Sequence, residues 1–258
     1  MLGRAAAFLY GVLCYLAFFA TFLYAIGFIG NIGVPKSIDS GPQLPFLQAL
    51  AINLALLGLF AVQHSLMARP WFKAAWTRIV PTVVERSTYV LFSSLALSLL
   101  FWLWQPMGGV IWSVGNPTGR LILQALYVFG VLTILIATFL INHFDLFGLR
   151  QVWVHLRGRA YTPLAFRTPG PYNYVRHPLY VGWLLMFWSA PVMTASHLVF
   201  AIGTTIYILV AIQLEERDLV DLHAEYAEYR RRVPMLVPIG SKRGAGAEVN
   251  PTAARQVS

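Results

Sequence analysis

The sequence predicts an all-α integral membrane protein with four spanning helices, a C-terminal helical hairpin and a cytoplasmic helical extension. Of its 258 residues, 58% are hydrophobic and only 11% are charged. A soluble domain has about 25% charged residues. Four uncharged stretches are each long enough for a membrane helix of about 20 residues, and a fifth is long enough to fold back on itself.

Gaps between charged residues place the four spanning helices. We expect them near Ala5–Ile29, Phe46–Met67, Thr88–Trp104 and Leu121–Ile141. The first apolar run is longer than the about 7–15 residues of a signal-peptide core, and no convincing cleavage site follows it. We therefore expect it to stay in the membrane.

Loop charges predict the orientation. Loops 68–87 and 143–178 are rich in Lys and Arg, whereas loop 30–45 has one Lys and one Asp and loop 105–119 has no charge. The positive-inside rule places the basic loops and both termini in the cytoplasm. The net charge of +9 is explained by this orientation, because the basic residues do not form one continuous face for nucleic acid.

The hairpin is predicted from the uncharged segment between Arg176 and Glu215. Leu179–Ser189 is too short to span a membrane, and a second helix from Ser196 continues past the membrane to Arg232. We expect the hairpin to enter and leave on one side, which brings its two charged ends together. Pro234 is expected to end the second helix.

We expect one membrane domain over residues 1–240, with a functional core at about 142–238. The remaining residues, 241–258, are small and polar and predict a disordered tail. Polar residues in and beside the apolar helices are candidates for function. A carboxylate at membrane depth is costly and usually functional, which singles out Glu215 and Glu216. We expect Arg217 to neutralise one of them.

Three further ionisable residues lie at the predicted cytoplasmic ends of the second and fourth helices: His64, His143 and Asp145. A lone histidine in a membrane helix is often only a packing or hydrogen-bonding residue. Here, however, several ionisable residues lie at the same expected membrane depth as the charged residues near Arg176 and Glu215, which favours a functional site. The His-x-Asp spacing also suggests a metal, but no third ligand has suitable spacing, so we expect none.

The most specific signals are the motif Arg-His-Pro-x-Tyr-x-Gly at residues 176–182, the pair Glu215-Glu216, and the ending Tyr-x-x-Tyr-x-x-x-Val-Pro at 226–234. Together they resemble the integral-membrane methyltransferases, a superfamily with isoprenylcysteine carboxyl methyltransferases, phospholipid N-methyltransferases and NnrU-like proteins. Segments 63–65, 84–89 and 142–151 are similar to the methanethiol S-methyltransferase family of bacteria. The resemblance extends from about Val62 to Pro238.

The resemblance implies that the chain binds S-adenosylmethionine (SAM). The residues implied in cofactor binding are Arg176, His177, Pro178, Leu179, Tyr180, Gly182, Glu215, Glu216 and Tyr229. An arginine can form paired hydrogen bonds with the carboxylate of such a ligand. A glycine lets a backbone or a ligand approach closely.

For the methyl acceptor, the resemblance implies a small thiol, most simply methanethiol, which would be converted to dimethyl sulfide. The thiolate is the nucleophile, so we expect a base among His64, His143 and Asp145. We expect the pocket walls to be Tyr89, Asn142, Phe144, Phe147 and Trp153.

Two alternatives remain open. One is the same chemistry on a prenylcysteine carboxylate, a phospholipid amine or another thiol, and the other is a non-enzymatic NnrU-like membrane protein. The resemblance implies the inner membrane of a bacterium, with membrane lipids as partners.

Overall fold

The structure is a computed structural model that describes residues 1–222 and 224–239. Within these described residues, five helices are long and apolar enough to cross a membrane. They are α1 (Leu2–Gly30), α2 (Phe46–Ala68), α4 (Thr82–Leu103), α5 (Pro117–Leu140) and α9 (Ala195–Leu222). The chain is therefore a multi-pass membrane protein. The predicted disordered tail at 241–258 lies outside the described residues.

Shorter elements connect these helices. They are α3 (Pro70–Trp76), α6 (His143–Leu146), α7 (Leu149–Leu156), η1 (Gly170–Asn173), α8 (Pro178–Trp188) and α10 (Ala224–Arg232), with strands β1 (Val110–Ser113) and β2 (Val192–Thr194). Local sequence explains several boundaries. Pro117 and Pro178 occupy the first turns of their helices, where a missing N–H has no consequence. The Asn116 side chain caps α5 by accepting from the N–H groups of Thr118 and Gly119.

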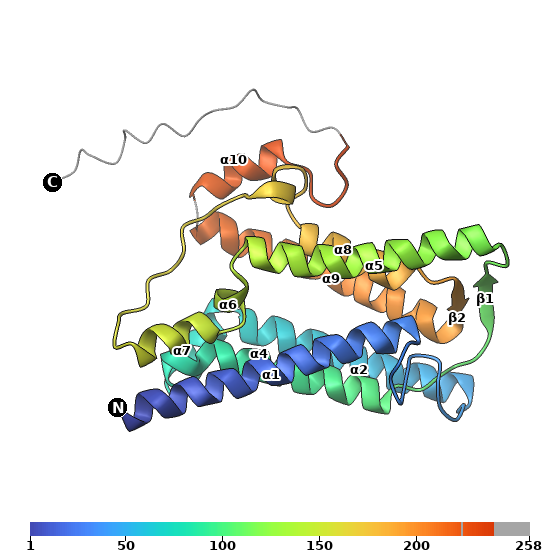
Figure 1. The fold of residues 1–258 in the computed structure, drawn as a ribbon, viewed down its shortest axis with the longest axis horizontal. Coiled ribbons are helices and arrows are strands. Elements are labelled where there is room, and N and C mark those ends of the chain that lie inside the picture. Colours follow the sequence, from blue (N-terminus) through green and yellow to red (C-terminus); the bar gives the residue numbers. More distant parts are fainter. Residues whose placement is uncertain (223, 240–258) are drawn as a thin grey trace.

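The helices form two groups (Figure 1). In one, α4 packs between α1 and α2, and in the other, α8 packs on α5 and α9. The packing of α2 on α9 joins the groups. One end of the bundle carries the N-terminus, α6, α7 and α10, and is called the α10 end below. The opposite end carries the two strands and is called the sheet end (Figure 1).

The sheet end has a well-packed core. Trp104, Phe28 and Phe200 are buried and pack edge to face. The Trp104 indole N–H donates to Ser196 Oγ at 2.8 Å, and that hydroxyl donates to the carbonyl of Ile38. The buried Trp104 indole and Ser196 hydroxyl are thus paired, which is required where no water can replace a lost partner.

The prediction of a purely helical chain was incomplete, because β1 and β2 form a two-stranded antiparallel sheet. Three- and four-residue strands inside apolar sequence have no periodicity that separates them from a loop. The sheet also changes the expected course of the C-terminal hairpin. Although α8 has only 11 residues, the extended chain after it carries β2 to the sheet end (Figure 1).

Two helix boundaries also differ from expectation. Helix α4 begins at Thr82, six residues before the expected Thr88, because a helix that leaves the membrane tolerates Glu85 and Arg86 in its first turns. The helix expected to be continuous from Ser196 to Arg232 is described as α9 and α10. Helix α10 lies beside η1 at the α10 end (Figure 1).

Candidate functional site

At the α10 end, Glu216 of α9 is buried and is the centre of an ion cluster. Its Oε1 accepts from Arg176 Nε at 2.7 Å and from His177 Nε2 at 2.9 Å. Arg230 Nε of α10 lies 3.9 Å from Oε2. Glu216 is 4% exposed and His177 is 6% exposed. A buried carboxylate is stable in such a place only when positive or donating groups surround it. These four residues are called the Glu216 cluster below.

The Glu216 cluster also holds the C-terminal segment in place. Arg176 Nη1 donates to the carbonyls of Arg230 and Val233, at 2.9 Å and 2.6 Å. The backbone N–H groups of Arg176 and His177 donate to the carbonyls of Pro234 and Met235. Arg217 was expected to neutralise one of the two carboxylates, and for Glu216 the structure places Arg176, 40 residues earlier in the chain, in that position.

The neighbouring carboxylate, Glu215, has different partners. Its Oε2 accepts a hydrogen bond from the Tyr180 hydroxyl at 3.0 Å. The hydroxyls of Tyr89 and Tyr207 also lie within electrostatic range of Glu215. Helices α4, α8 and α9 each contribute one of these tyrosines, of which Tyr180 alone donates to Glu215 among the described residues. These residues are called the Glu215 group below.

His64 of α2 lies beside the Glu215 group. Its Nδ1 lies 2.9 Å from Ser93 Oγ, and the Tyr89 hydroxyl lies 2.9 Å from its Nε2 and 3.2 Å from its Nδ1. Ser93 Oγ donates to the carbonyl of Tyr89, so it accepts from His64. The network therefore assigns the proton to Nδ1 and leaves Nε2 as an acceptor. Phe60 stacks on the imidazole.

His143 of α6 has the same pattern of partners. Its Nδ1 lies 2.9 Å from Thr138 Oγ1, which donates to the carbonyl of Leu135, and its Nε2 lies 2.9 Å from the Tyr15 hydroxyl. Thr138 Oγ1 therefore accepts from Nδ1, which places a proton on that nitrogen. Burial lowers the pKa of His143 below its ordinary value. Phe139 stacks on the ring with centroids 4.3 Å apart.

Asp145 does not pair with either histidine. Its Oδ1 accepts from Arg150 Nη1 at 2.9 Å and from the Tyr161 hydroxyl at 3.1 Å. Asn142 has a positive φ of 88° and caps α6 through its side chain. In the part of the chain that the structure describes, no group of three or more His, Cys, Asp or Glu side chains could hold a metal ion.

The residues expected to form the pocket walls differ in their burial. Phe147 stacks on Phe18 with centroids 3.8 Å apart and packs against the cluster that contains Tyr89. Phe144 and Trp153 are each 49% exposed. Phe144 contacts His143, whereas Trp153 contacts Phe8 and Arg157. Of the predicted walls, Tyr89 contacts His64 directly, and Phe147 packs against the cluster that contains Tyr89.

The remaining predicted cofactor residues position the motif. Pro178 is buried at the start of α8, followed by the half-buried Leu179. Gly182 lies against the backbone of α5. The Tyr229 hydroxyl donates to the carbonyl of Tyr172 at 2.6 Å, and burial raises the pKa of Tyr229 to about 12. This bond ties α10 to η1.

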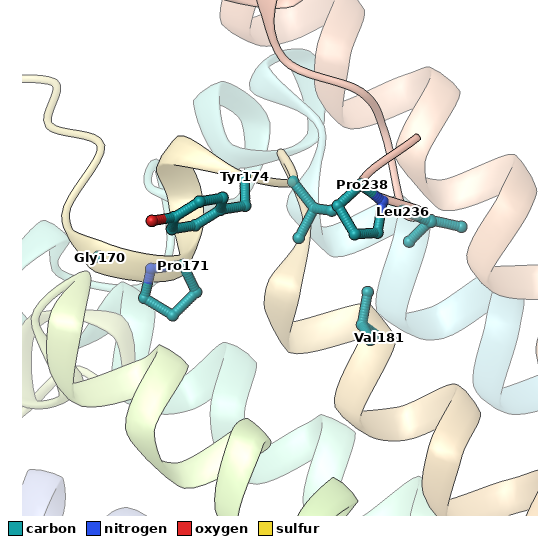
Figure 2. Close-up of a pocket in the computed structure, with 7 residues that line it drawn as sticks. Gly170, Pro171, Tyr174, Val181, Leu236 and Pro238 are labelled. Atoms are coloured by element: carbon teal, nitrogen blue, oxygen red, sulfur yellow. The ribbon is translucent and has the colours of Figure 1, made fainter. Parts of the chain in front are cut away.

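In the part of the chain that the structure describes, two cavities lie at the α10 end. The first, of about 460 Å³, has apolar walls from η1 and the following residues, from α8 and from the C-terminal segment. Figure 2 shows Pro171 and Tyr174 on one side of it and Leu236 and Pro238 on the other, with Val181 nearby. The second, of about 590 Å³, has polar walls that include Arg86, Asp145 and Tyr161.

Three residues at the site were not predicted from sequence. Tyr207 contacts His64 edge to face, and it lies two helical turns before Glu215, which was the available signal. Arg69 Nη1 pairs with Asp218 at 3.0 Å and donates to the carbonyl of Leu214, which ties α2 to α9. Ser93 had no signal, because a serine in a membrane helix most often bonds its own helix.

Comparison with known proteins gives consistent matches. The family model for phospholipid methyltransferases matches residues 121–223. A methanethiol S-methyltransferase of Crocosphaera subtropica is 60% identical, over 93% of this chain and 95% of that protein. One of Mycobacterium tuberculosis is 53% identical, over 91% and 97%. Nurim of Rattus norvegicus is 35% identical, over 69% and 71%. No solved structure matches.

Proposed function

The chain belongs to the family of the methanethiol S-methyltransferases, and from this premise we propose that it transfers a methyl group from SAM to methanethiol. The products are dimethyl sulfide and S-adenosylhomocysteine. The observation that carries the proposal is the 60% identity over 95% of a methanethiol S-methyltransferase. We place the protein in the inner membrane of a bacterium with the α10 end in the cytoplasm, because the basic loops lie at that end.

The residues at the α10 end suit SAM. The Tyr226 hydroxyl is buried without a hydrogen-bond partner among the described residues, and it lies within electrostatic range of Glu215 and Glu216. The apolar cavity of Figure 2 adjoins Arg176 through Val175 and offers walls for an adenine ring. An unpartnered donor, two carboxylates and an apolar wall match a ligand that carries hydroxyl groups, a positive charge and a flat base.

Each cluster then has a role. The Glu216 cluster fixes the C-terminal segment that closes one wall of the cavity. The Glu215 group supplies a carboxylate and phenol oxygens. Their negative charge and dipoles would attract the positively charged sulfur of SAM. When bound, SAM supplies a methyl group on that sulfur.

On the acceptor side, His64 and Tyr89 take the thiol proton. Tyr89 passes its hydroxyl proton to His64 Nε2 as it accepts the proton of the thiol, which leaves a thiolate, the reactive form. This thiolate would receive the methyl group that bound SAM would supply. Ser93 holds His64 in the tautomer that this proton transfer needs.

A phospholipid amine is the second candidate acceptor, since the phospholipid methyltransferase model matches residues 121–223. Such an acceptor carries acyl chains and needs a wide opening between helices. The stacked rings of Phe18 and Phe147 beside Tyr89 favour the small thiol.

The test is headspace gas chromatography on the detergent-purified chain with SAM and methanethiol. We expect dimethyl sulfide from the wild type, loss of SAM binding in Glu216→Ala and His177→Ala, and loss of product with SAM binding retained in His64→Ala. Glu228→Gln is the matched control, because Glu228 is an exposed carboxylate of α10 that pairs with Arg231 and Arg232.

The same samples distinguish the alternatives. SAM binding without product would discard methanethiol, and a parallel assay with phosphatidylethanolamine would then test the second acceptor. A wild-type chain that neither binds SAM nor makes product would overturn the proposal and favour a non-enzymatic role.

A further inference from the structure

The second cavity, called the interface pocket below, lies where the chain leaves two membrane helices. Its walls come from α3, from the start of α4, from residues just after α5, from α7 and from residues 159–161. Its volume of about 590 Å³ is enough for a small polar group. None of the proposed catalytic steps uses this pocket.

The charges around the interface pocket are mainly positive. Lys73, Arg86 and Arg159 line it, against the carboxylates Glu85 and Asp145. Asp145 is already paired with Arg150. Among the described residues, the side chains of Lys73 and Arg159 form no hydrogen bond or ion pair. The pocket therefore has positive charge to share with a ligand.

The start of α4 adds to this character. Thr82 and Val83 line the pocket, and Pro81 before them provides no side-chain cap for the helix. The first N–H groups of a helix lack partners within the helix and favour an anion. The lysine and arginines around the pocket are an independent feature that favours the same kind of ligand.

An apolar surface leads out of the pocket along α5. Ile141 is both a wall of the pocket and 37% exposed. The exposed side chains of Leu140, Ile136 and Leu132 continue from it along the helix. A spanning helix that exposes such residues faces lipid, so a ligand with acyl chains could place them here and its head group in the pocket.

We propose that the interface pocket binds the phosphate of an anionic membrane phospholipid, with the acyl chains along α5. Basic pockets beside the cytoplasmic ends of membrane helices suit such head groups. Arg86 connects the pocket to the Glu215 group, because its Nε donates to the carbonyl of Leu146 and its guanidinium lies 5.2 Å from the ring centre of Tyr89.

The experiment is native mass spectrometry of the full chain released from detergent with phosphatidylglycerol or phosphatidylcholine. The test variant is Lys73→Gln/Arg159→Gln, which leaves Arg86 in place. The control variant is Arg78→Gln/Arg167→Gln, which removes the same charge from exposed residues outside the pocket. Thermal unfolding of each variant checks that it is folded.

We expect phosphatidylglycerol to be retained by the wild type and the control, and about thirtyfold weaker binding in the test variant, since each basic residue contributes about 1 kcal/mol. Equal retention in the test variant would overturn the proposal. Equal retention of phosphatidylcholine would remove the preference for an anionic lipid. Displacement of the lipid by millimolar inorganic phosphate would reassign the pocket to a soluble anion.

Discussion

Gly130 of α5 and Gly182 of α8 lie in direct backbone contact. A Cβ added to either glycine would lie 2.8 Å from the carbonyl oxygen of the other. Gly182 and Tyr180 both belong to α8, and His177 is the residue just before this helix. The contact of Gly182 with α5 therefore fixes the position of α8 and, with it, of the Tyr180 and His177 side chains. The glycine of the motif is thus explained by helix packing.

Replacing Gly182 with alanine should destabilise the protein by about 1–3 kcal/mol, the usual effect of overpacking. The added carbon would lie 2.9 Å from the Ile134 nitrogen as well as against the Gly130 carbonyl, and backbone atoms cannot easily move away. Thermal unfolding in detergent measures the change. Gly58→Ala in α2 is the control, since nothing lies within 4 Å of its added carbon. Equal melting temperatures for both variants would contradict the packing explanation.

Glu216→Gln should destabilise the chain by about 3 kcal/mol, the lower end of the effect of removing one partner from a buried ion pair. The amide keeps the shape of the carboxylate but leaves Arg176 and His177 without its charge, and the side chains of Arg176 and Glu216 are only 11% and 5% exposed. Denaturant unfolding gives the free energy directly. Glu228→Gln, at a half-exposed carboxylate, should change it little. A similar small loss in both variants would mean that the Glu216 cluster is not a stabilising unit.

The spanning helices could be predicted because a membrane helix needs an uncharged run, and such runs are visible in the sequence. The hydrogen-bond and ion-pair partners of the site residues could not be predicted in this way. Arg217 is next to Glu216 in the chain but turns about 100° away around the helix, whereas Arg176 reaches it through the fold. Likewise, the sequence singled out His64, His143 and Tyr89 but not the hydroxyls of Ser93 and Tyr15, because those two contacts join residues 29 and 128 positions apart in the chain.

Ser93→Ala should lower kcat by about tenfold, less than the about 10²–10⁴-fold that general acid–base groups themselves contribute, while SAM affinity is unchanged. Without the serine oxygen, His64 loses the acceptor that keeps its proton on Nδ1. Ser93→Thr keeps a hydroxyl and should restore activity. Ser94→Ala is the matched control, because that hydroxyl bonds only the carbonyl of Val90 in its own helix. If Ser93→Ala retained wild-type kcat and pH profile, Ser93 would have no positioning role.

His143 should make the protein less stable in mild acid. Burial lowers its pKa in the folded state, so the unfolded chain, with an ordinary pKa of about 6.5, binds more protons as the pH falls. This contribution to stability is complete above about pH 6.5 and is lost as the pH falls from there through the lowered folded pKa. Melting temperatures between about pH 7.5 and 5.5 should therefore fall in the wild type and fall less in His143→Gln. Tyr15→Phe keeps the histidine and removes only the hydroxyl at Nε2, so it should retain the acid sensitivity. Parallel curves for the wild type and His143→Gln would show that His143 does not cause it.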